Sequence, residues 1–430
     1  MARISRVRAR EALDSRGNPT VEVEVYLGDG ARGRALVPSG ASTGKGEALE
    51  LRDADPERYL GRGVRKALGN IEREIGPALR GAEALNQRRL DARLVELDGT
   101  PDKHRLGANA LLGVSLAVAR AGAASAGLPL YRYLGGAAAD ELPVPMVNIL
   151  SGGIHGGGNI DLQDLQVIPL RARNYAEALQ DVAAVYSEMK EVLKSRGVFR
   201  PGVADEGGYA PALATNEAAF ELMVEAFERA GLKPGRDADI AVDVAASHFF
   251  EEGRYRLATE GVALDPRQMV ERLVAWAARF PILSIEDGLA DDDWQGWNLL
   301  TERLGAHCQL IGDDLFVTHR ERLEKGLREK VANAVLVKMN QVGTLSETLE
   351  VVELARRHGY QAVISARSGE TEDDSIADLA VATGASQIKV GAITRSERLA
   401  KYNRLLRIEE RLGEHAVYRG AKVFARWRLP

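Results

Sequence analysis

Short apolar runs that end in a charged residue recur along the second half of the chain. Four of them are Ile240–Asp243, Ile282–Glu286, Leu310–Asp313 and Val335–Lys338. Amphipathic stretches separate them, which is the rhythm of a parallel β/α fold with strands buried on both faces. The last two intervals are close to the ~31 residues per unit of an eightfold barrel. An open doubly wound sheet is the alternative, but its G-x-G-x-x-G loop after a first strand is not found in that context.

The first part of the chain follows a different pattern. Apolar and polar residues alternate over Val21–Leu27, a Gly28-Asp29-Gly30 turn follows, and a second run spans Arg34–Val37. This pattern predicts an antiparallel hairpin with one face in water. The stretch Ala108–Ala126 is rich in alanine and leucine and predicts a well-covered helix. A small α+β domain is therefore expected ahead of the barrel.

The pattern changes near the proline-spaced segment Leu142-Pro143-Val144-Pro145. We predict an α+β domain over residues 1–138 and a β/α barrel over residues 139–430. Beyond this boundary, helix ends are indicated by typical capping residues. These are the pairs Asn174/Glu177 and Thr344/Glu347, the start Asp265-Pro266, and Gly359 at a helix C-terminus.

Composition excludes several classes of protein. The 430 residues are 45% hydrophobic, enough for a large core, and the net charge of -5 gives no basic field for nucleic acid. The single cysteine, Cys308, excludes an internal disulfide framework and fits a reducing compartment. The amino terminus has no signal-peptide core, and no window reaches the ~18 apolar residues of a membrane span. We expect a cytoplasmic protein that acts on small molecules.

The charged strand ends predict a cation site. Asp243, Glu286 and Asp313 supply hard oxygen ligands of the kind that Mg²⁺ prefers, and the next strand end is Lys338. A single carboxylate at such a position can simply cap the next helix, but three in succession favour a metal site. The seven histidines form no H-x-x-x-H pair, so zinc is not supported.

A second lysine, Lys389, lies inside the apolar run Gln387–Gly391. Burying an ammonium group without partners is costly, so a functional role is favoured over an edge-strand lysine that reaches water. If Lys338 and Lys389 converge near a cation, each lowers the proton affinity of the other. One of them would then be neutral and able to act as a base.

Two further segments carry candidate chemistry. The turn Asp205–Pro211 contains paired acids before two glycines, which would aim Glu206 inward as a general acid, although an acidic surface turn looks the same locally. Arg367 and Ser368 follow the apolar run Ala362–Ile364 and suit a phosphate clamp. The alternative for Arg367 is a structural pair with a carboxylate.

Two loops are built from small residues. Pro38–Lys45 fails the G-x-x-x-x-G-K-[ST] spacing of a P-loop, and a mobile loop over an active site is the better interpretation. Ser151–Asn159 is the second, and a flexible linker is its alternative. His155 within it is placed to reach a substrate.

Several motifs together resemble the enolase family, in the same order and from about Ile4 to Glu410. They are Asp14–Glu22, Pro38–Gly44, Asp205–Pro211, Ser284–Leu289, Gly312–Leu315 and Arg367–Asp373. The resemblance implies an N-terminal α+β capping domain and a modified TIM-type barrel whose first units depart from plain βα alternation. It also implies a homodimer or larger assembly, two Mg²⁺ ions, and reversible dehydration of 2-phosphoglycerate to phosphoenolpyruvate.

The resemblance further assigns roles, residue by residue. Lys338 would remove the C2 proton, and Glu206, supported by Asp205, would protonate the leaving hydroxyl. The other assignments place Asp243, Glu286 and Asp313 on the first Mg²⁺, Ser42 on the second, Arg367 and Ser368 on the phosphate, and His155, Gln163, Asp164 and Lys389 near substrate. A lysine base with one or two Mg²⁺ ions is the known solution for stabilising an enediolate.

The chain departs from the family pattern at three positions near the leaving hydroxyl and the lids. Ala366 stands where enolases usually have histidine, Asp164 where they have glutamate, and Ser151 where they have asparagine. These differences leave open an enolase-like paralogue acting on 2-phosphoglycerate or a related phosphorylated acid, such as a carboxyphosphonoenolpyruvate synthase. A catalytically weak scaffold protein is a third possibility, from another class.

Overall fold

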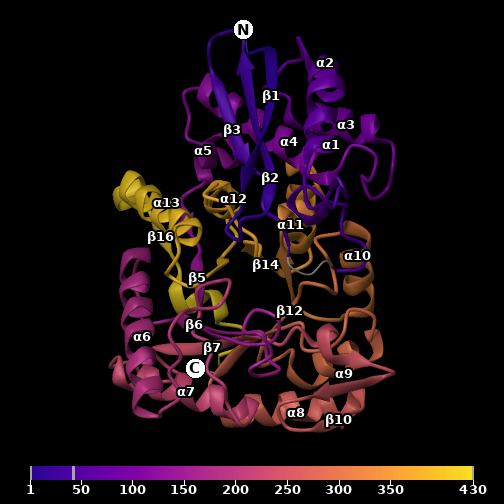
Figure 1. Ribbon diagram of the computed structural model, residues 1–430. Helices are drawn as coiled ribbons and strands as arrows, with labels where there is room; N and C mark the ends of the chain where they lie inside the picture. Colours follow the sequence, from indigo (N-terminus) through magenta and orange to yellow (C-terminus); the bar gives the residue numbers. More distant parts are fainter. Residues whose placement is uncertain (1, 41–43, 429–430) are drawn as a thin grey trace.

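The structure is a computed structural model that describes residues 2–40 and 44–428. It has an N-terminal part with a small sheet and helices, at the top of Figure 1, and a barrel below it. In the N-terminal part, the strands are β1 Ile4–Leu13, β2 Pro19–Leu27 and β3 Arg32–Leu36, in the order β1-β2-β3. The helices there are α1 Arg65–Asn70, α2 Gly76–Leu79, α3 Gln87–Asp98, α4 Ala108–Ser125 and α5 Leu130–Gly135.

The predicted hairpin exists, but it is two strands of a three-stranded antiparallel sheet. The sequence interpretation missed β1, whose small apolar residues alternate with exposed arginines and give a weak signal. The face expected to be wet is partly covered, because Arg10 of β1 pairs with Glu22 and Glu24 of β2, and Glu22 is only 7% exposed.

Helix α4 packs against β2 and β3, as its composition predicts. A Cβ atom at Gly33 would lie 2.1 Å from the carbonyl oxygen of Ala117, so the close approach of β3 to α4 requires glycine there. By length and composition α4 is long and apolar enough to cross a membrane, but 83% of it is buried inside the protein. Its burial identifies it as a core helix.

The second part is a closed eight-stranded barrel, which confirms the barrel and excludes the doubly wound sheet. Its order is β11-β12-β13-β14-β15-β5-β6-β7. The strands are β5 Val144–Ser151, β6 Asp164–Pro169, β7 Ala238–Asp243, β11 Ile282–Glu286, β12 Gln309–Gly312, β13 Ala334–Val337, β14 Gln361–Ser365 and β15 Gln387–Gly391.

Helices surround this barrel, as Figure 1 shows. They are α6 Tyr175–Ser195, α7 Asn216–Arg229, α8 Pro266–Arg279, α9 Trp294–Leu304, α10 Arg320–Glu329, α11 Leu345–Arg357, α12 Ser375–Thr383 and α13 Ser396–Leu412. The smaller strands are β4 Glu141–Leu142, paired with β16 Val417–Tyr418, and a sheet of β8 Phe250–Glu251, β9 Arg254–Leu257 and β10 Val262–Leu264.

The predicted helix caps are confirmed. The side chains of Asn174, Thr344 and Asp265 accept hydrogen bonds from the third residue of their helices, and Asp265 forms a full capping box with Gln268. Gly359 follows α11 with a φ of 74°, the left-handed conformation that ends many helices.

Strand β6 runs antiparallel to both of its neighbours, β5 and β7. The chain therefore begins the barrel with a ββ connection, and plain βα alternation starts only later, as the resemblance to enolases implies. Reversal places the start of β6 beside the ends of the other strands, and Asp164 pairs in register with Asp243 and with Ser151. One edge of the barrel thus collects polar side chains from both strand directions.

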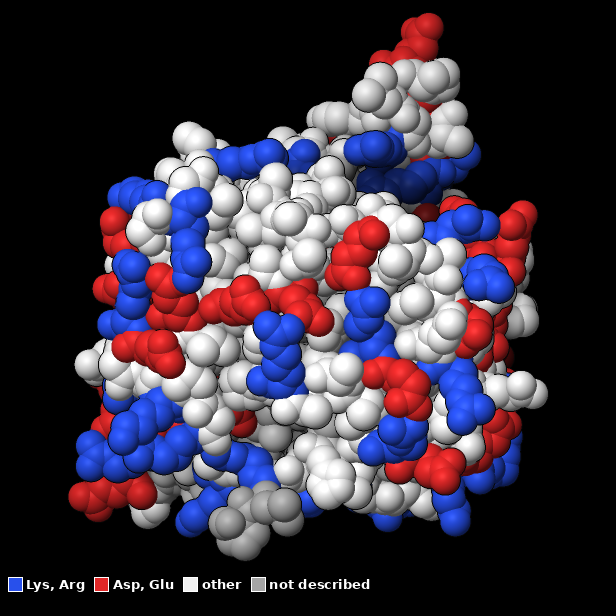
Figure 2. Space-filling view, turned by 90° about the horizontal axis from the view of Figure 1, so that it is seen from below, with Lys and Arg blue, Asp and Glu red and all other residues white. Residues whose placement is uncertain are grey.

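The opposite end of the barrel is closed by apolar residues. Phe424 and Trp427 from the C-terminal segment pack against the lower barrel layer, which includes Val144, Ile168 and Leu336. Figure 2 views the molecule from below Figure 1, and basic and acidic side chains are intermingled on that face. The polar side chains of the strand ends therefore lie at the other edge of the barrel.

Candidate active site

A pocket opens at the polar edge of the barrel. Residues on its wall come from strand ends and from loops, and include His155, Glu206, Asp243, Asp313, Lys338 and Lys389. The expectation that charged strand ends share one edge is therefore confirmed geometrically. Glu206, which is 7% exposed, lines the pocket and is not part of a surface turn.

Lys389 bridges two of the predicted metal ligands. Its Nζ lies 2.7 Å from Oδ2 of Asp243 and 2.7 Å from both carboxylate oxygens of Glu286. The lysine is 6% exposed, and its strand β15 lies between β14 and β5 in a closed barrel, which has no edge strand. The edge-strand interpretation is therefore wrong. A positive charge already lies between the ends of β7 and β11, where the sequence predicts a cation.

Lys338 pairs with the third predicted ligand. Its Nζ contacts Oδ2 of Asp313, while Gln341 donates to Oδ1 of Asp313 at 3.0 Å. Gln163 donates to Oδ2 of Asp243 at 3.2 Å. Each carboxylate of the set is thus oriented by a neighbour from another part of the chain.

Both lysines are paired directly with carboxylates, which favours their charged forms. Burial is the largest influence on the pKa of Lys338 and lowers it, and Arg367 and Lys389 lower it too, but Asp313 outweighs them and the pKa is raised. Burial likewise lowers the pKa of Lys389, yet Asp243 and Glu286 raise it well above its ordinary value. In this arrangement direct pairing with carboxylates outweighs the repulsion between the two lysines, and a neutral lysine beside a bound cation stays a prediction.

Arg367 and Ser368 both line the pocket. The Nη1 atom of Arg367 lies 2.9 Å from Oε2 of Glu47 and donates to Oδ1 of Asn340, also at 2.9 Å. The alternative interpretation, a pair with a carboxylate, therefore describes this arginine, although its guanidinium still faces the pocket. Glu47 comes from the N-terminal part, so the pair joins that part to the barrel.

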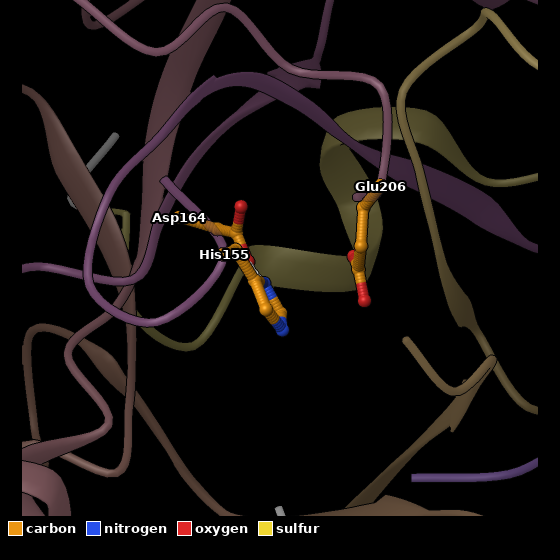
Figure 3. Close-up of side chains that lie close together, drawn as sticks. All are labelled: His155, Asp164 and Glu206. Carbon is orange, nitrogen blue, oxygen red and sulfur yellow. Dashed lines mark hydrogen bonds and ion pairs between the residues drawn. The ribbon is translucent and has the colours of Figure 1, made fainter. Parts of the chain in front are cut away.

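A second group of side chains lies at the reversed strand β6. His155 is hydrogen-bonded through Nδ1 to Oδ2 of Asp164 at 2.9 Å, and the Ser151 hydroxyl donates to Oδ1 of Asp164 at 2.6 Å. Figure 3 shows His155 and Asp164 side by side with Glu206 facing them. Burial lowers the pKa of His155, but Asp164 reverses this and raises it to about 9. An imidazolium ion therefore faces Glu206.

Ala366 also lines the pocket, with only a methyl group where the family usually has an imidazole. Its backbone is fixed, since its N–H donates to the carbonyl oxygen of Lys389 at 2.9 Å. Ser42, the residue predicted to help hold a second Mg²⁺, lies outside the described residues. Asp205 is half-buried and precedes Glu206 in the turn.

Sequence reasoning missed several residues that line the pocket or orient its side chains. Glu47 and His248 line the pocket without any local motif, and burial lowers the pKa of His248. Asn148, inside an apolar strand, donates to Oε2 of Glu206 at 3.0 Å. Asp287 accepts the backbone N–H groups of Asp313 and Asp314 at 2.9 and 2.8 Å. Only Asp287 had a signal, its place directly after Glu286.

Metal binding fits the chemistry of the donor set. Among the described residues, possible ligand atoms of Asp287, Asp313 and Asp314 lie within 4.8 Å of one another, as do those of His155, Asp164 and Glu206. Asp243, Glu286 and Asp313 occupy neighbouring strand ends, where Lys389 pairs with the first two and Lys338 with the third. Carboxylate oxygens gathered in this way suit a divalent ion such as Mg²⁺.

Comparison with known protein families covers almost the whole chain. Residues 4–134 match the N-terminal domain of enolase, and residues 139–427 match the C-terminal TIM barrel domain of enolase. The two matches follow each other in the same order as the two parts of the structure. This chain belongs to the enolase family.

Proposed function

We propose that the protein catalyses the reversible dehydration of 2-phosphoglycerate to phosphoenolpyruvate with the help of Mg²⁺. The observation that carries the proposal is one pocket that brings together Lys338, which directly follows strand β13, and the buried carboxyl group of Glu206, from the turn between α6 and α7. Such a pair supplies the base and the acid that an elimination of water needs.

Removing a proton next to an ionised carboxylate places a second negative charge on that group. Two Mg²⁺ ions would stabilise this charge, the first held by Asp243, Glu286 and Asp313 and the second with the help of Ser42. When these carboxylates serve as metal ligands, they no longer raise the proton affinity of Lys338. The nearby charges of Arg367 and Lys389 then act in the opposite direction and favour the neutral amine.

The hydroxyl side depends on Glu206. Asn148 orients its carboxyl group, and Asp164 and Ser151 hold His155 opposite it. In this proposal Glu206 gives its proton to the leaving hydroxyl, with Asp205 as its support. Ala366 contributes no polar group, so the elimination step relies more heavily on Glu206 than in relatives with histidine there.

Substrate anchoring would come from groups of opposite charge around the pocket. Arg367 and Ser368 would bind the phosphate, and Gln163, Lys389 and His155 would contact the rest of the acid. We also expect a homodimer or larger assembly in the cytoplasm. Light scattering tests the assembly, and a mass of one chain would contradict it.

The test is phosphoenolpyruvate formation from 2-phosphoglycerate, with Mg²⁺ and with the metal removed by a chelator. We expect turnover that requires Mg²⁺. Mg²⁺-dependent substrate binding without turnover would overturn the proposal and favour a paralogue that acts on a related phosphorylated acid, as Ala366 suggests. Absence of both binding and turnover would favour a scaffold protein.

A further inference from the structure

Arg398 on α13 is one of the largest fully buried side chains of the described protein, with 0% exposure. Its Nη1 donates to the carbonyl oxygens of Arg367 at 2.6 Å and Val390 at 3.0 Å. Its Nη2 donates to the carbonyl oxygen of Ser368 at 2.7 Å. One guanidinium therefore holds the backbone of both candidate phosphate-binding residues and the strand that carries Lys389.

A gain in folding stability alone does not explain why the charge of Arg398 is buried in this way. Lys401, one turn later on α13, is also fully buried, but its Nζ lies 2.7 Å from Oε2 of Glu370. The ion pair of Arg398 is looser: its Nε lies 3.6 Å from Oε1 of the neighbouring Glu397. The hydrogen bonds of this buried guanidinium go to backbone carbonyls, and the burial of a charge with so loose an ion pair is a departure of the kind expected at functional sites.

Arg398 also approaches Glu206, with Gly391 between them. Gly391 separates the two residues with a φ of 109°, and a Cβ atom there would lie 2.9 Å from the Glu206 carbonyl oxygen and 3.2 Å from Cδ of Arg398. Glycine thus permits the arginine to approach. Burial raises the pKa of Glu206, but Arg398 is the strongest of the charges that lower it overall, ahead of His155, Lys389 and Lys338.

We propose that Arg398 is a positioning residue of the active site, which fixes the carbonyls of Arg367 and Ser368 and places a permanent positive charge behind Glu206. This inference rests on the proposed function. One side chain would thereby couple the two halves of the site, the phosphate clamp and the hydroxyl side, without touching substrate.

The first test measures binding of 2-phosphoglycerate, and separately of inorganic phosphate, by calorimetry with Mg²⁺ present. Arg398→Met removes the three hydrogen bonds at nearly constant volume and should weaken binding of 2-phosphoglycerate ~10-fold or more. Arg398→Lys retains a hydrogen-bond donor and should lose less affinity for 2-phosphoglycerate than Arg398→Met. Because this readout needs no turnover, it tests the clamp even if the proposed reaction is wrong.

The second test is the pH profile of phosphoenolpyruvate hydration, for which Glu206 must be ionised. The charged groups around Glu206 are Arg398, His155, Lys389, Lys338 and the carboxylate of Asp164. Asn148 donates a hydrogen bond to Glu206. Removing the positive charge raises the pKa of Glu206, so the acidic limb should move to higher pH in Arg398→Met. Arg398→Lys should keep the limb near its original position.

Arg404 on the same helix provides a matched control. It pairs with Asp378 at 2.6 Å and does not line the pocket. Arg404→Met should leave binding and the pH limb unchanged. If Arg398→Met fails to fold, Arg398→Gln is measured in its place with the same expectations. The proposal would be overturned if the folded Arg398 variant kept both its affinity for 2-phosphoglycerate and the acidic limb of its pH profile. Equal changes in these two quantities in Arg404→Met would also overturn it. Absent turnover in the unsubstituted protein contradicts the proposed function instead.

Discussion

Replacing Lys389 with methionine tests whether Mg²⁺ can take the place of the lysine's positive charge beside Asp243 and Glu286. Lys389 is the shared partner of Asp243 and Glu286, whose side chains are only 4% and 2% exposed. The substitution leaves two buried carboxylates close together without their ammonium. Removing one partner of a buried pair costs about 3–5 kcal/mol of unfolding free energy.

If those carboxylates form a metal site, Mg²⁺ should restore much of this loss. A ligand at 100 times its Kd stabilises the folded state by about 2.7 kcal/mol, and loss of the competing lysine should tighten Mg²⁺ binding. We therefore expect Lys389→Met to be destabilised without Mg²⁺ and to gain more stability from Mg²⁺ than the unsubstituted protein. Urea unfolding with and without Mg²⁺ measures both quantities without reference to activity.

Lys103 supplies the control for this experiment. It is 6% exposed and pairs with Glu347 at 2.8 Å, away from the pocket. Lys103→Met should lose stability in a way that Mg²⁺ does not restore. A Lys389→Met protein whose loss is equally insensitive to Mg²⁺ would refute the reasoning.

Three other substitutions test separate parts of the account. Ala366→His should raise the rate of elimination more than the rate of proton exchange at C2, and equal effects in the two assays would contradict the role of that position. The pKa of His155 is raised to about 9 beside Asp164, and Asp164→Asn should lower it. An NMR titration of the variant measures this change. The same pair contributes stability that is present below pH ~6.5 and is lost as the pH rises through about 9, so the variant should lack this pH dependence. Gly33→Ala should destabilise the fold by about 1–3 kcal/mol, because its Cβ would meet the backbone of α4; unchanged unfolding would show that the sheet can shift.

The barrel was predictable because buried strands that end in charge are a local pattern. Asp243, Glu286, Asp313 and Lys338 each end or follow a barrel strand, so their shared edge follows from the topology. The reversal of β6 was not readable from its own residues, because an apolar run buried on both faces looks the same in either direction. Strand β1 was missed for a different reason, since its arginines dilute the apolar signal.

The electrostatics of the site could not be obtained from the sequence. The spacing of Lys338 and Lys389 suggested mutual repulsion, but their direct partners are carboxylates that only the folded chain brings close. Glu47 and Arg367 lie far apart in sequence, and no local pattern links them. Arg398 stands among other charged residues of α13, where a helix pattern favours a solvent-exposed face, yet it is fully buried.

Proton exchange at C2 of 2-phosphoglycerate in deuterated water, followed by NMR with Mg²⁺ present, tests the central claim most directly. We predict rapid exchange in the unsubstituted protein, retained exchange with little dehydration in Glu206→Gln, and loss of exchange in Lys338→Met or after removal of Mg²⁺. Exchange that persists in Lys338→Met would contradict the assignment of Lys338 as the base and the account built on it.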